Sequence, residues 1–303
     1  MSCEYLPFVI KADIMILYSP AKLNLYLDIL NKRPDGYHNI CTIFERIALF
    51  DKIILAPSKD GKIIIKSDSR DIPGDSRNIV YKAALLLKND FNIPAGVDIE
   101  IKKTIPVGAG LGGGSSNAAS VLLGLNEFWG LNLSRKNLLR YAEKLGSDTA
   151  FFLYNSPYAL GTGRGERILP LSNFRRKLWH VLAVPDLKVS TRKIYRAFDN
   201  FKAKEKYSRP QLARRQLLRQ AIDSLSGILF NRLEGVTFRR YPEVKKIKDG
   251  FKKHGLNKVL MSGSGSAVFG IVKSRKEGLR AAKFFKGFKG LRVFVIATAK
   301  SAK

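Results

Sequence analysis

The chain has 303 residues, of which 45% are hydrophobic and 10% aromatic, enough for one large or two ordinary domains with a sizeable core. No apolar run reaches the roughly 18 residues that span a membrane, and MSCEYLPFVIKADIMIL lacks the basic start of a secretory signal. The two cysteines, Cys3 and Cys41, and three scattered histidines give no disulfide framework and no zinc-binding spacing. These features exclude a disulfide-stapled secreted domain and predict a cytoplasmic protein with no membrane partner.

Charge is spread unevenly along the chain. The formal net charge is +29, of which residues 1–170 carry +4 and residues 171–303 carry +25. We therefore predict a domain boundary near residue 170, between an N-terminal domain (1–170) and a strongly basic C-terminal domain (171–303). A basic half can serve nucleic acid, an anionic membrane or a polyphosphate substrate. Its basic residues are mixed with helix-forming apolar positions, however, which favours a solvated helical surface.

The first strong element, residues 14–30, alternates apolar and polar side chains on either side of Pro20 and predicts two strands. Lys22 and Asn24 share the polar face, two positions apart. The default expectation for such a lysine is a solvent-facing position on an edge strand.

A strong turn signal, RPDG, comes next, and Tyr37 and His38 follow it directly. This pair could stack on and hydrogen-bond a planar ring, or it could simply pack at an ordinary turn, and the sequence leaves both open. Beyond it we predict strands at 47–56 and 62–67 and an amphipathic helix at 76–91, with Ser76 as its N-cap.

A glycine-rich loop, PVGAGLGGGSSNAAS (106–120), lies between a predicted strand at 97–106 and a predicted helix at 117–129. Glycine lets a ligand approach the backbone amides closely, and Ser115 and Ser116 are good N-cap residues. Because a helix start offers unpaired N–H groups and partial positive charge, the loop is predicted to hold a phosphate; the alternative is a packed glycine turn. It matches neither a Walker A loop, which ends in Gly-Lys-Ser/Thr, nor a Rossmann loop.

Asp148 stands between the end of a predicted helix (134–145, with Ser134 as N-cap) and the apolar run FFLY. A carboxylate there is either partnered and functional or the cap of the next helix. GTGRGERI (161–168) then predicts a hairpin. The second half predicts an α+β arrangement. Strands are predicted at 179–186 and 291–299, and a strand–turn–strand or strand–turn–helix unit at 259–272. One helix is predicted to begin with Ser190 or Thr191 as its cap, and three further helices are predicted at 209–234, 242–254 and 276–287.

Four motifs together resemble the GHMP small-molecule kinases, and more closely their branch that acts on 4-diphosphocytidyl-2-C-methyl-D-erythritol in non-mevalonate isoprenoid precursor biosynthesis. The resemblance covers the chain from about Ser19 onward. It implies an α+β, two-domain fold, with a ribosomal-protein-S5-like N-terminal α/β domain and a C-terminal α+β sandwich domain. The motifs are SPAKLNLYLDIL with RPDGYHNICTIF (19–44), NIVYKAALLL (78–87), the glycine loop (106–120) and LGSDTAFFL with GTGRGE (145–166), and MSGSGSAVFG (261–270) resembles the family's third loop.

The resemblance also implies an ATP-dependent kinase for the 2-hydroxyl of that substrate, with ATP and Mg²⁺ as cofactors. Lys22 and Asp148 would be the catalytic pair: Asp148 would accept the hydroxyl proton and Lys22 would keep it ionised. No side-chain ligand set for the metal is implied beyond the hydroxyl of Ser115 or Ser116. The ATP site would comprise Asn78, Lys103, Pro106, Val107, Gly108, Ala109, Gly110, Leu111, Gly112, Gly113, Gly114, Ser115 and Ser116. The substrate site would comprise Asn24, Tyr37, His38, Phe44, Thr191 and Tyr195, with Tyr37 and Tyr195 sandwiching the cytosine.

The sequence departs from the family pattern at a few points. Gly-Ser-Asp-Thr-Ala surrounds Asp148 where Gly-Ala-Asp-Val-Pro is usual, Tyr195 replaces a common phenylalanine, and about fifteen residues precede the usual start. Two alternatives stay open: a homoserine or mevalonate kinase of the same superfamily, and a basic nucleic-acid-binding protein. The RPDGYH turn favours a base-containing substrate over the first, and the lack of a recognisable nucleic-acid module disfavours the second. A monomer or homodimer is expected.

Overall fold

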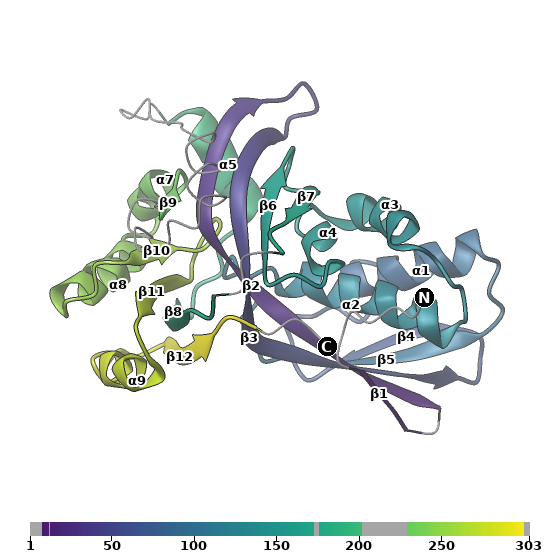
Figure 1. The fold of residues 1–303 in the computed structure, drawn as a ribbon. Helices are drawn as coiled ribbons and strands as arrows, with labels where there is room; N and C mark the ends of the chain where they lie inside the picture. The colour runs from purple at the N-terminus through teal and green to yellow at the C-terminus, as the bar shows by residue number, and fades with distance from the viewer. Residues whose placement is uncertain (1–7, 12, 173–175, 202–228, 300–303) are drawn as a thin grey trace.

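The computed structural model describes residues 8–11, 13–172, 176–201 and 229–299, which form two sheets with helices packed on them (Figure 1). The first sheet is organised by a long hairpin. Its strands β2 (Ile14–Lys32) and β3 (His38–Ser58) pair antiparallel, and β1 (Phe8–Lys11) extends the edge beside β2. The predicted break at Pro20 is wrong, because β2 runs through it with a register shift between Pro20 and Ala21.

The polar face of β2 is buried, so the expectation of a solvent-facing lysine on an edge strand is wrong. Lys22, Asn24 and Asp28 are at most 4% exposed. Residues from the second half of the chain cover this face: the Asn24 N–H donates to Ser262 Oγ at 3.3 Å, and Arg232 Nε donates to Asp28 at 2.9 Å. Strand alternation predicts two faces but not what lies against each of them.

Four helices pack on one face of the first sheet (Figure 1). They form an apolar core with β3 and its neighbours, in which α2 contacts α1, α3, α4 and β2. The helices are α1 (Ile79–Asp90), α2 (Gly113–Phe128), α3 (Arg135–Leu145) and α4 (Thr149–Phe152). The first half of the chain also contributes β4 (Ile63–Ser67), β5 (Gly96–Lys102) and the predicted hairpin of β6 (Tyr158–Thr162) and β7 (Arg167–Pro170) to this sheet.

Helix caps test the sequence prediction closely. Ser134 caps α3 as predicted, because its side chain accepts from the Asn137 N–H. Ser76 does not cap α1; that helix starts two residues later, and Asn78 accepts from the Val80 N–H at 2.9 Å. Serine and asparagine are equally good caps, so the sequence alone did not decide between them.

The second sheet has the strand order β10-β11-β8-β12, as expected for a C-terminal α+β unit. Of the helix predicted at 209–234, residues 209–228 lie outside the described residues. The prediction is wrong for residues 229–233, because β9 (Phe230–Asn231) pairs with β2 of the first sheet. The elements are β8 (Trp179–Pro185), α5 (Thr191–Asp199), α7 (Glu234–Arg240), α8 (Pro242–Lys253), β10 (Val259–Met261), β11 (Val268–Val272), α9 (Arg275–Lys283) and β12 (Leu291–Ala297). The boundary predicted near residue 170 lies between β7 and β8, and as a division into domains it stays a prediction.

A buried polar cluster joins the two sheets. Glu45 on β3 accepts a hydrogen bond from Thr298 at 2.7 Å, and the same oxygen lies 2.9 Å from Nε2 of His180 on β8. Glu45 and His180 are fully buried, and Thr298 also forms a bridge with Ile47. Because a buried carboxylate is costly without partners, these contacts hold the two sheets at a defined relative position.

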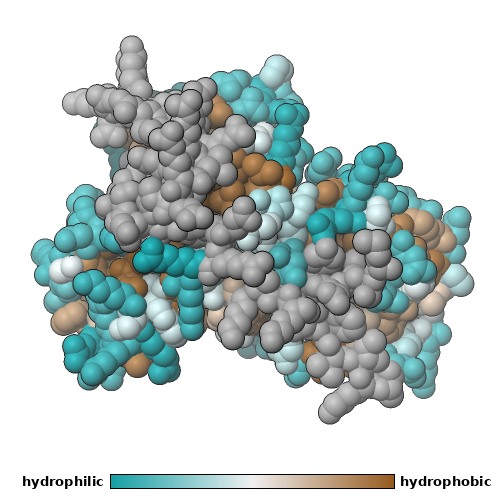
Figure 2. Space-filling model, in the orientation of Figure 1, coloured by the Kyte–Doolittle hydropathy of each residue, from teal (hydrophilic) through white to brown (hydrophobic). Residues whose placement is uncertain are grey.

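No helix in the described part of the chain combines the length and apolar content needed to cross a membrane. On the face shown in Figure 2, hydrophilic side chains dominate the end of the molecule that carries α8 and α9. Helix α8 buries Val244 and Ile247 and exposes Lys245 and Lys246. It is therefore the basic amphipathic helix that was predicted, with Lys245 and Lys246 in solvent and Lys248 paired with Glu234.

Candidate active site

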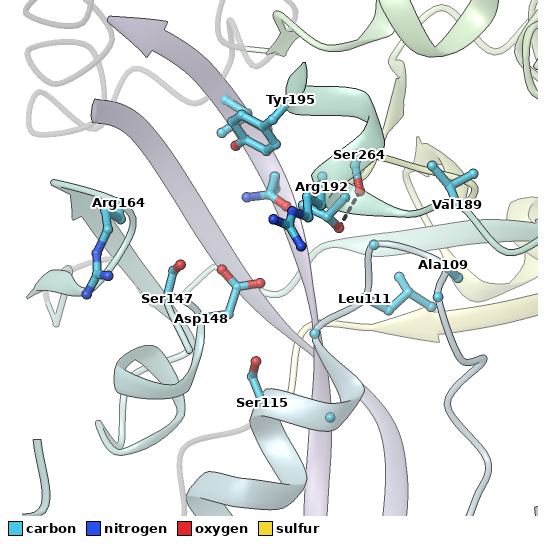
Figure 3. Close-up of a pocket in the computed structure, with 18 of the residues that line it drawn as sticks. Ala109, Leu111, Ser115, Ser147, Asp148, Arg164, Val189, Arg192, Tyr195 and Ser264 are labelled. Carbon is cyan, nitrogen blue, oxygen red and sulfur yellow. Dashed lines mark hydrogen bonds between the residues drawn. The ribbon is translucent and has the colours of Figure 1, made fainter. Parts of the chain in front are cut away.

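One cavity of about 1080 Å³ lies between the two sheets and collects most of the predicted site residues (Figure 3). Its walls come from β2, the turn after β2, the glycine loop, the start of α4, helix α5 and the loop between β10 and β11. Ligand pockets in proteins are usually about 300–1,000 Å³, so this cavity has room for two substrates side by side.

The glycine loop is fixed by hydrogen bonds to its carbonyl groups. The carbonyls of Gly108 and Ala109 accept from the backbone N–H groups of Val189 and Ala267, each at 3.1 Å. The next two accept from the Ser262 hydroxyl and from the Lys22 backbone N–H, each at 3.0 Å. With four successive carbonyls held by other segments, the amides of the same loop remain available to a ligand.

Two glycines of this loop cannot be replaced without displacing a neighbouring group. A Cβ on Gly110 would lie 2.2 Å from the carbonyl oxygen of Ser262, and Gly110 also has φ +77°. A Cβ on Gly112, where φ is +67°, would lie 2.9 Å from the Lys22 side chain. The glycines therefore permit both the left-handed backbone and the close approach of the loop to β2 and to the β10–β11 loop.

Helix α2 begins inside the glycine run, earlier than predicted, and its N-cap is Gly112, which provides no side-chain hydrogen bond. The prediction of Ser115 or Ser116 as the cap is therefore wrong. Ser115 instead lines the cavity from the first turn, whereas Ser116 is fully buried behind it. The first N–H groups of a helix have no partner within it, so the uncapped start of α2 presents them to the cavity as a site for an anion.

Lys22 and Asp148 meet in the cavity although they are far apart in the sequence. Lys22 Nζ lies 3.2 Å from Asp148 Oδ2, with the lysine side chain 4% exposed and the carboxylate 30% exposed. Nζ also donates to Asn24 Oδ1 at 2.5 Å, and the Asn24 amide donates to Thr42 at 2.7 Å. Asp148 precedes α4 but makes no capping hydrogen bond, so its carboxylate is left for Lys22 and for a ligand.

Lys103 reaches the cavity from the segment that enters the glycine loop. Its ammonium group pairs with the fully buried Asp51. The second Asp51 oxygen accepts from the N–H groups of Thr104 and Ile105, both at 2.8 Å. A single buried carboxylate thus holds both the lysine and the backbone ahead of the loop.

The far end of the cavity is lined by rings and by a charged cluster. The His38 ring lies 5.3 Å from the ring of Tyr195, and Nε2 lies 2.7 Å from Asp199 Oδ1. Lys32 donates to the other Asp199 oxygen at 2.6 Å, and this bond, followed by the one to His38, lowers the pKa of Asp199. Burial and the nearby Asp148 carboxylate raise the pKa of the Tyr195 phenol. Tyr37 is 54% exposed.

The structure brings most of the predicted residues together and leaves three outside. Asn78 caps α1, Ser116 is buried in α2, and Phe44 is fully buried, with its ring 4.9 Å from that of Phe151. None of these three lines the cavity, and the roles predicted for them stay predictions. The predicted residues in the cavity wall are Lys22, Asn24, Tyr37, His38, Lys103, Pro106, Val107, Gly108, Ala109, Gly110, Leu111, Gly112, Gly113, Gly114, Ser115, Asp148, Thr191 and Tyr195.

Sequence reasoning missed several charged and polar residues of the wall. Arg164 and Ser264 lie within the motifs GTGRGE and MSGSGSAVFG, so those motifs could have indicated them. Ser264 hydrogen-bonds Thr191 at 2.9 Å (Figure 3). The others gave no signal, because only the fold brings them to the cavity; they include Lys32, Arg192, Arg196 and Asp199.

Comparison with known proteins identifies the family. The model of the GHMP kinase N-terminal domain matches residues 78–156, and that of the GHMP kinase C-terminal domain matches residues 209–288. The chain belongs to the GHMP kinase family. Among its relatives in this family, 4-diphosphocytidyl-2-C-methyl-D-erythritol kinase of Geobacillus sp. (strain WCH70) is 42% identical over 286 residues, which cover 93% of this chain and 96% of the relative. The kinase of the same name from Bacillus subtilis (strain 168) is 40% identical and covers 89% and 92%.

Solved GHMP kinases share the fold. A crystal structure of 4-(cytidine 5'-diphospho)-2C-methyl-D-erythritol kinase superposes with a TM-score of 0.75 at 33% identity, covering 94% of this chain and all of the other. Homoserine kinase from Cytophaga hutchinsonii superposes with a TM-score of 0.68, covering 98% of each chain, but is 18% identical. At that identity the second match shows the fold alone.

Proposed function

We propose that this GHMP kinase transfers the γ-phosphoryl group of ATP to the 2-hydroxyl of 4-diphosphocytidyl-2-C-methyl-D-erythritol. The observation that carries the proposal is the Lys22–Asp148 pair, 3.2 Å apart, in one cavity with the glycine loop at one end and the Tyr37–His38 turn and Tyr195 at the other. Relatives named for this activity are 40–44% identical over about nine-tenths of the chain.

In the proposed reaction the 2-hydroxyl oxygen attacks the γ-phosphorus and the bond to the β-phosphate oxygen breaks, giving ADP and the 2-phosphate. Asp148 accepts the hydroxyl proton, which requires hydrogen-bond contact with that hydroxyl. Lys22 lies against the Asp148 carboxylate and supplies a cation beside the reacting group. Asn24 fixes the Lys22 ammonium from its other side.

The ATP phosphates would lie against the amides of Gly108–Gly114 and the uncapped start of α2, with Lys103 beside them. Phosphoryl transfer depends mainly on positioning and charge neutralisation, and a rigid set of N–H groups supplies both without a Walker lysine. The loop needs no rearrangement to do so, because its carbonyls are already held by the rest of the protein.

The residues present fit Mg²⁺ in one specific way. Mg²⁺ at kinase sites is held by substrate phosphates, waters and one or two protein oxygens, and the cavity offers the Ser115 hydroxyl in the first turn of α2. When bound, the ion would neutralise charge on the phosphate oxygens. Among the described residues no group of three acidic, histidine or cysteine side chains surrounds a metal position, so ATP itself would supply most of the ligands.

The cytosine would lie between Tyr37 and Tyr195, with His38 at its edge. The bond from His38 Nε2 to Asp199 fixes the orientation of the imidazole and leaves its other nitrogen for a ligand or the backbone. Arg164 lies 5.0 Å from the centre of the Tyr37 ring, which helps hold that exposed ring in place.

The alternatives are weaker on these observations. Homoserine and mevalonate kinases match this chain at 18% and 14% identity, at the level of fold only. Both family models that match the chain describe GHMP kinase domains, which favours a kinase over a nucleic-acid-binding protein. A cytoplasmic location and a monomeric or homodimeric state complete the proposal.

The deciding experiment is an ATP-consumption assay coupled to ADP release, with the cytidyl substrate, homoserine and mevalonate offered separately. Turnover is expected with the cytidyl substrate alone, and the product should carry its new phosphate on the 2-hydroxyl by phosphorus NMR. Faster turnover with homoserine or mevalonate would contradict the proposal.

A further inference from the structure

Six cationic side chains line the cavity, and two of them differ from the rest. Four have an acidic partner: Lys22 with Asp148, Lys32 with Asp199, Lys103 with Asp51 and Arg164 with Glu166. Arg192 and Arg196 form no ion pair with any residue that the structure describes, although both are cavity residues. An arginine directed into a cavity without a carboxylate partner is suited to an anionic ligand.

Both arginines belong to one face of α5. Residues 192, 195, 196 and 199 recur at the three- and four-residue spacing of a helix face, and all four line the cavity. Figure 3 shows Arg192 and Tyr195 directed into the cavity from this helix, with Asp148 across from Arg192. The face thus carries, on either side of the ring proposed to stack on cytosine, two cations that have no acidic partner among the described residues.

Contacts at the two ends of α5 show which end lies near the base site and which lies near the glycine loop. At its C-terminal end Asp199 holds His38, beside the base site. At its N-terminal end the Val189 N–H donates to the glycine loop at Gly108, and Thr191 hydrogen-bonds Ser264. One helical turn is about 5.4 Å, so Arg192 lies roughly one turn from Tyr195 toward the phosphate-binding end.

We propose that Arg192, assisted by Arg196, binds the diphosphate of the acceptor substrate. The inference rests on the proposed function, because the acceptor must place its groups in the order base, ribose, diphosphate and reacting alcohol between Tyr195 and Asp148. The position one turn from the base ring toward Asp148 is that of the diphosphate. A guanidinium binds two phosphate oxygens at once, and the start of α5 adds partial positive charge at the same place.

The proposal predicts that the site distinguishes a nucleoside diphosphate from the bare nucleoside. The probes are cytidine, CMP and CDP, measured by calorimetric titration and as inhibitors competitive with the acceptor. Arg192→Gln should weaken CDP binding by about 10- to 100-fold, the range for one charge-assisted hydrogen-bonded contact, and leave cytidine unchanged. Arg192→Lys, which keeps the charge but not the planar fork, should lie between the two.

Lys193→Gln is the matched control, because Lys193 is exposed on the same helix, carries the same charge and is not in the cavity wall. It should bind all three probes as the wild type does. Equal CDP affinity in the wild type and Arg192→Gln would overturn this inference alone, as would a change confined to the KM for ATP. A wild type that binds neither cytidine nor CDP would overturn the proposed function and this inference together.

Discussion

The two ends of the cavity recognise their ligands by different means. At the phosphate end the groups offered are backbone amides, held because four successive carbonyls of the loop are bonded to residues from three other segments. At the base end they are side chains on a turn and on α5, such as Tyr37, His38 and Tyr195. We therefore expect substitutions at the phosphate end to act mainly through backbone geometry, and substitutions at the base end to act through the loss of individual contacts.

The largest effect is expected where the two ends meet. Asp148→Asn keeps the shape of the side chain but removes the proton acceptor, so kcat should fall at least ~10²-fold, while the affinity for ATP changes little. Rapid-quench single-turnover measurement separates these quantities. Asp249→Asn, which removes a carboxylate on α8 that pairs with Lys245, is the control, and near-wild-type kcat in Asp148→Asn would exclude the proposed role.

At the phosphate end, Gly110→Ala should raise the KM for ATP at least ~10-fold, because the new Cβ meets the Ser262 carbonyl at 2.2 Å and pushes the amides away from the phosphates. Gly130→Ala is the matched control. Gly130 also has a positive φ, +61°, but nothing lies within 4 Å of its Cβ position. Both variants should lose about 1–2 kcal/mol from left-handed strain, and Gly110→Ala should lose more because of its overlap with Ser262, as measured by denaturant unfolding. An unchanged KM for ATP in Gly110→Ala would show that the loop is adaptable.

At the base end, Tyr195→Ala should raise the KM for the cytidyl substrate and leave the KM for ATP nearly unchanged. Stacking of a base on an aromatic side chain contributes about 1–3 kcal/mol, which corresponds to roughly 5- to 150-fold. Tyr37→Ala should have the same direction, and Tyr195→Phe should behave as the wild type if the ring face is what matters. If the KM for ATP rose instead, the cytosine site would not be at Tyr195.

The smallest effect is expected from pH. Lys32 and His38 lower the pKa of Asp199 below its ordinary 3.8. The ionised Asp199 therefore adds to the free energy of unfolding above that value, and this contribution is lost as the pH falls through the lowered pKa. The contribution should be below about 1 kcal/mol, since the pair is partly exposed. Denaturant unfolding at about pH 6 and about pH 3 should show that the free energy of unfolding falls less between these two pH values in Asp199→Asn than in the wild type. Equal losses would show that Asp199 is not coupled to folding.

Much of the fold followed from local patterns. The strands, the α3 cap at Ser134 and the β6–β7 hairpin are set by alternation, capping and turn chemistry. The starts of α1 and α2 were misplaced because several residues there can cap equally well, and because left-handed glycine at Gly112 let α2 begin inside the loop. Local sequence carries no information on which of two acceptable starts packs better.

The site residues that lie within recognisable motifs could be predicted from the sequence, and those outside the motifs could not. Lys22 and Asp148 came from a family resemblance, since strand alternation alone assigned Lys22 to solvent. Gly112 lies against the Lys22 side chain and Ser262 against the backbone of Asn24, and both approach this face of β2 only after folding. Arg192 and Arg196 lie in an ordinary basic helix by sequence, and their direction into the cavity depends on how α5 is placed by Val189 and Thr191.

The contacts of Thr298 and Ala299 have a consequence for the order of events on the ribosome. Glu45 and Arg46, near the middle of β3, obtain hydrogen bonds from Thr298 and from the Ala299 N–H. Domains emerging during synthesis begin to fold from the N-terminal side, so the first sheet forms while these partners are still untranslated. The nascent chain therefore carries Glu45 without Thr298, and these contacts between the two sheets form only after residue 299 has left the exit tunnel.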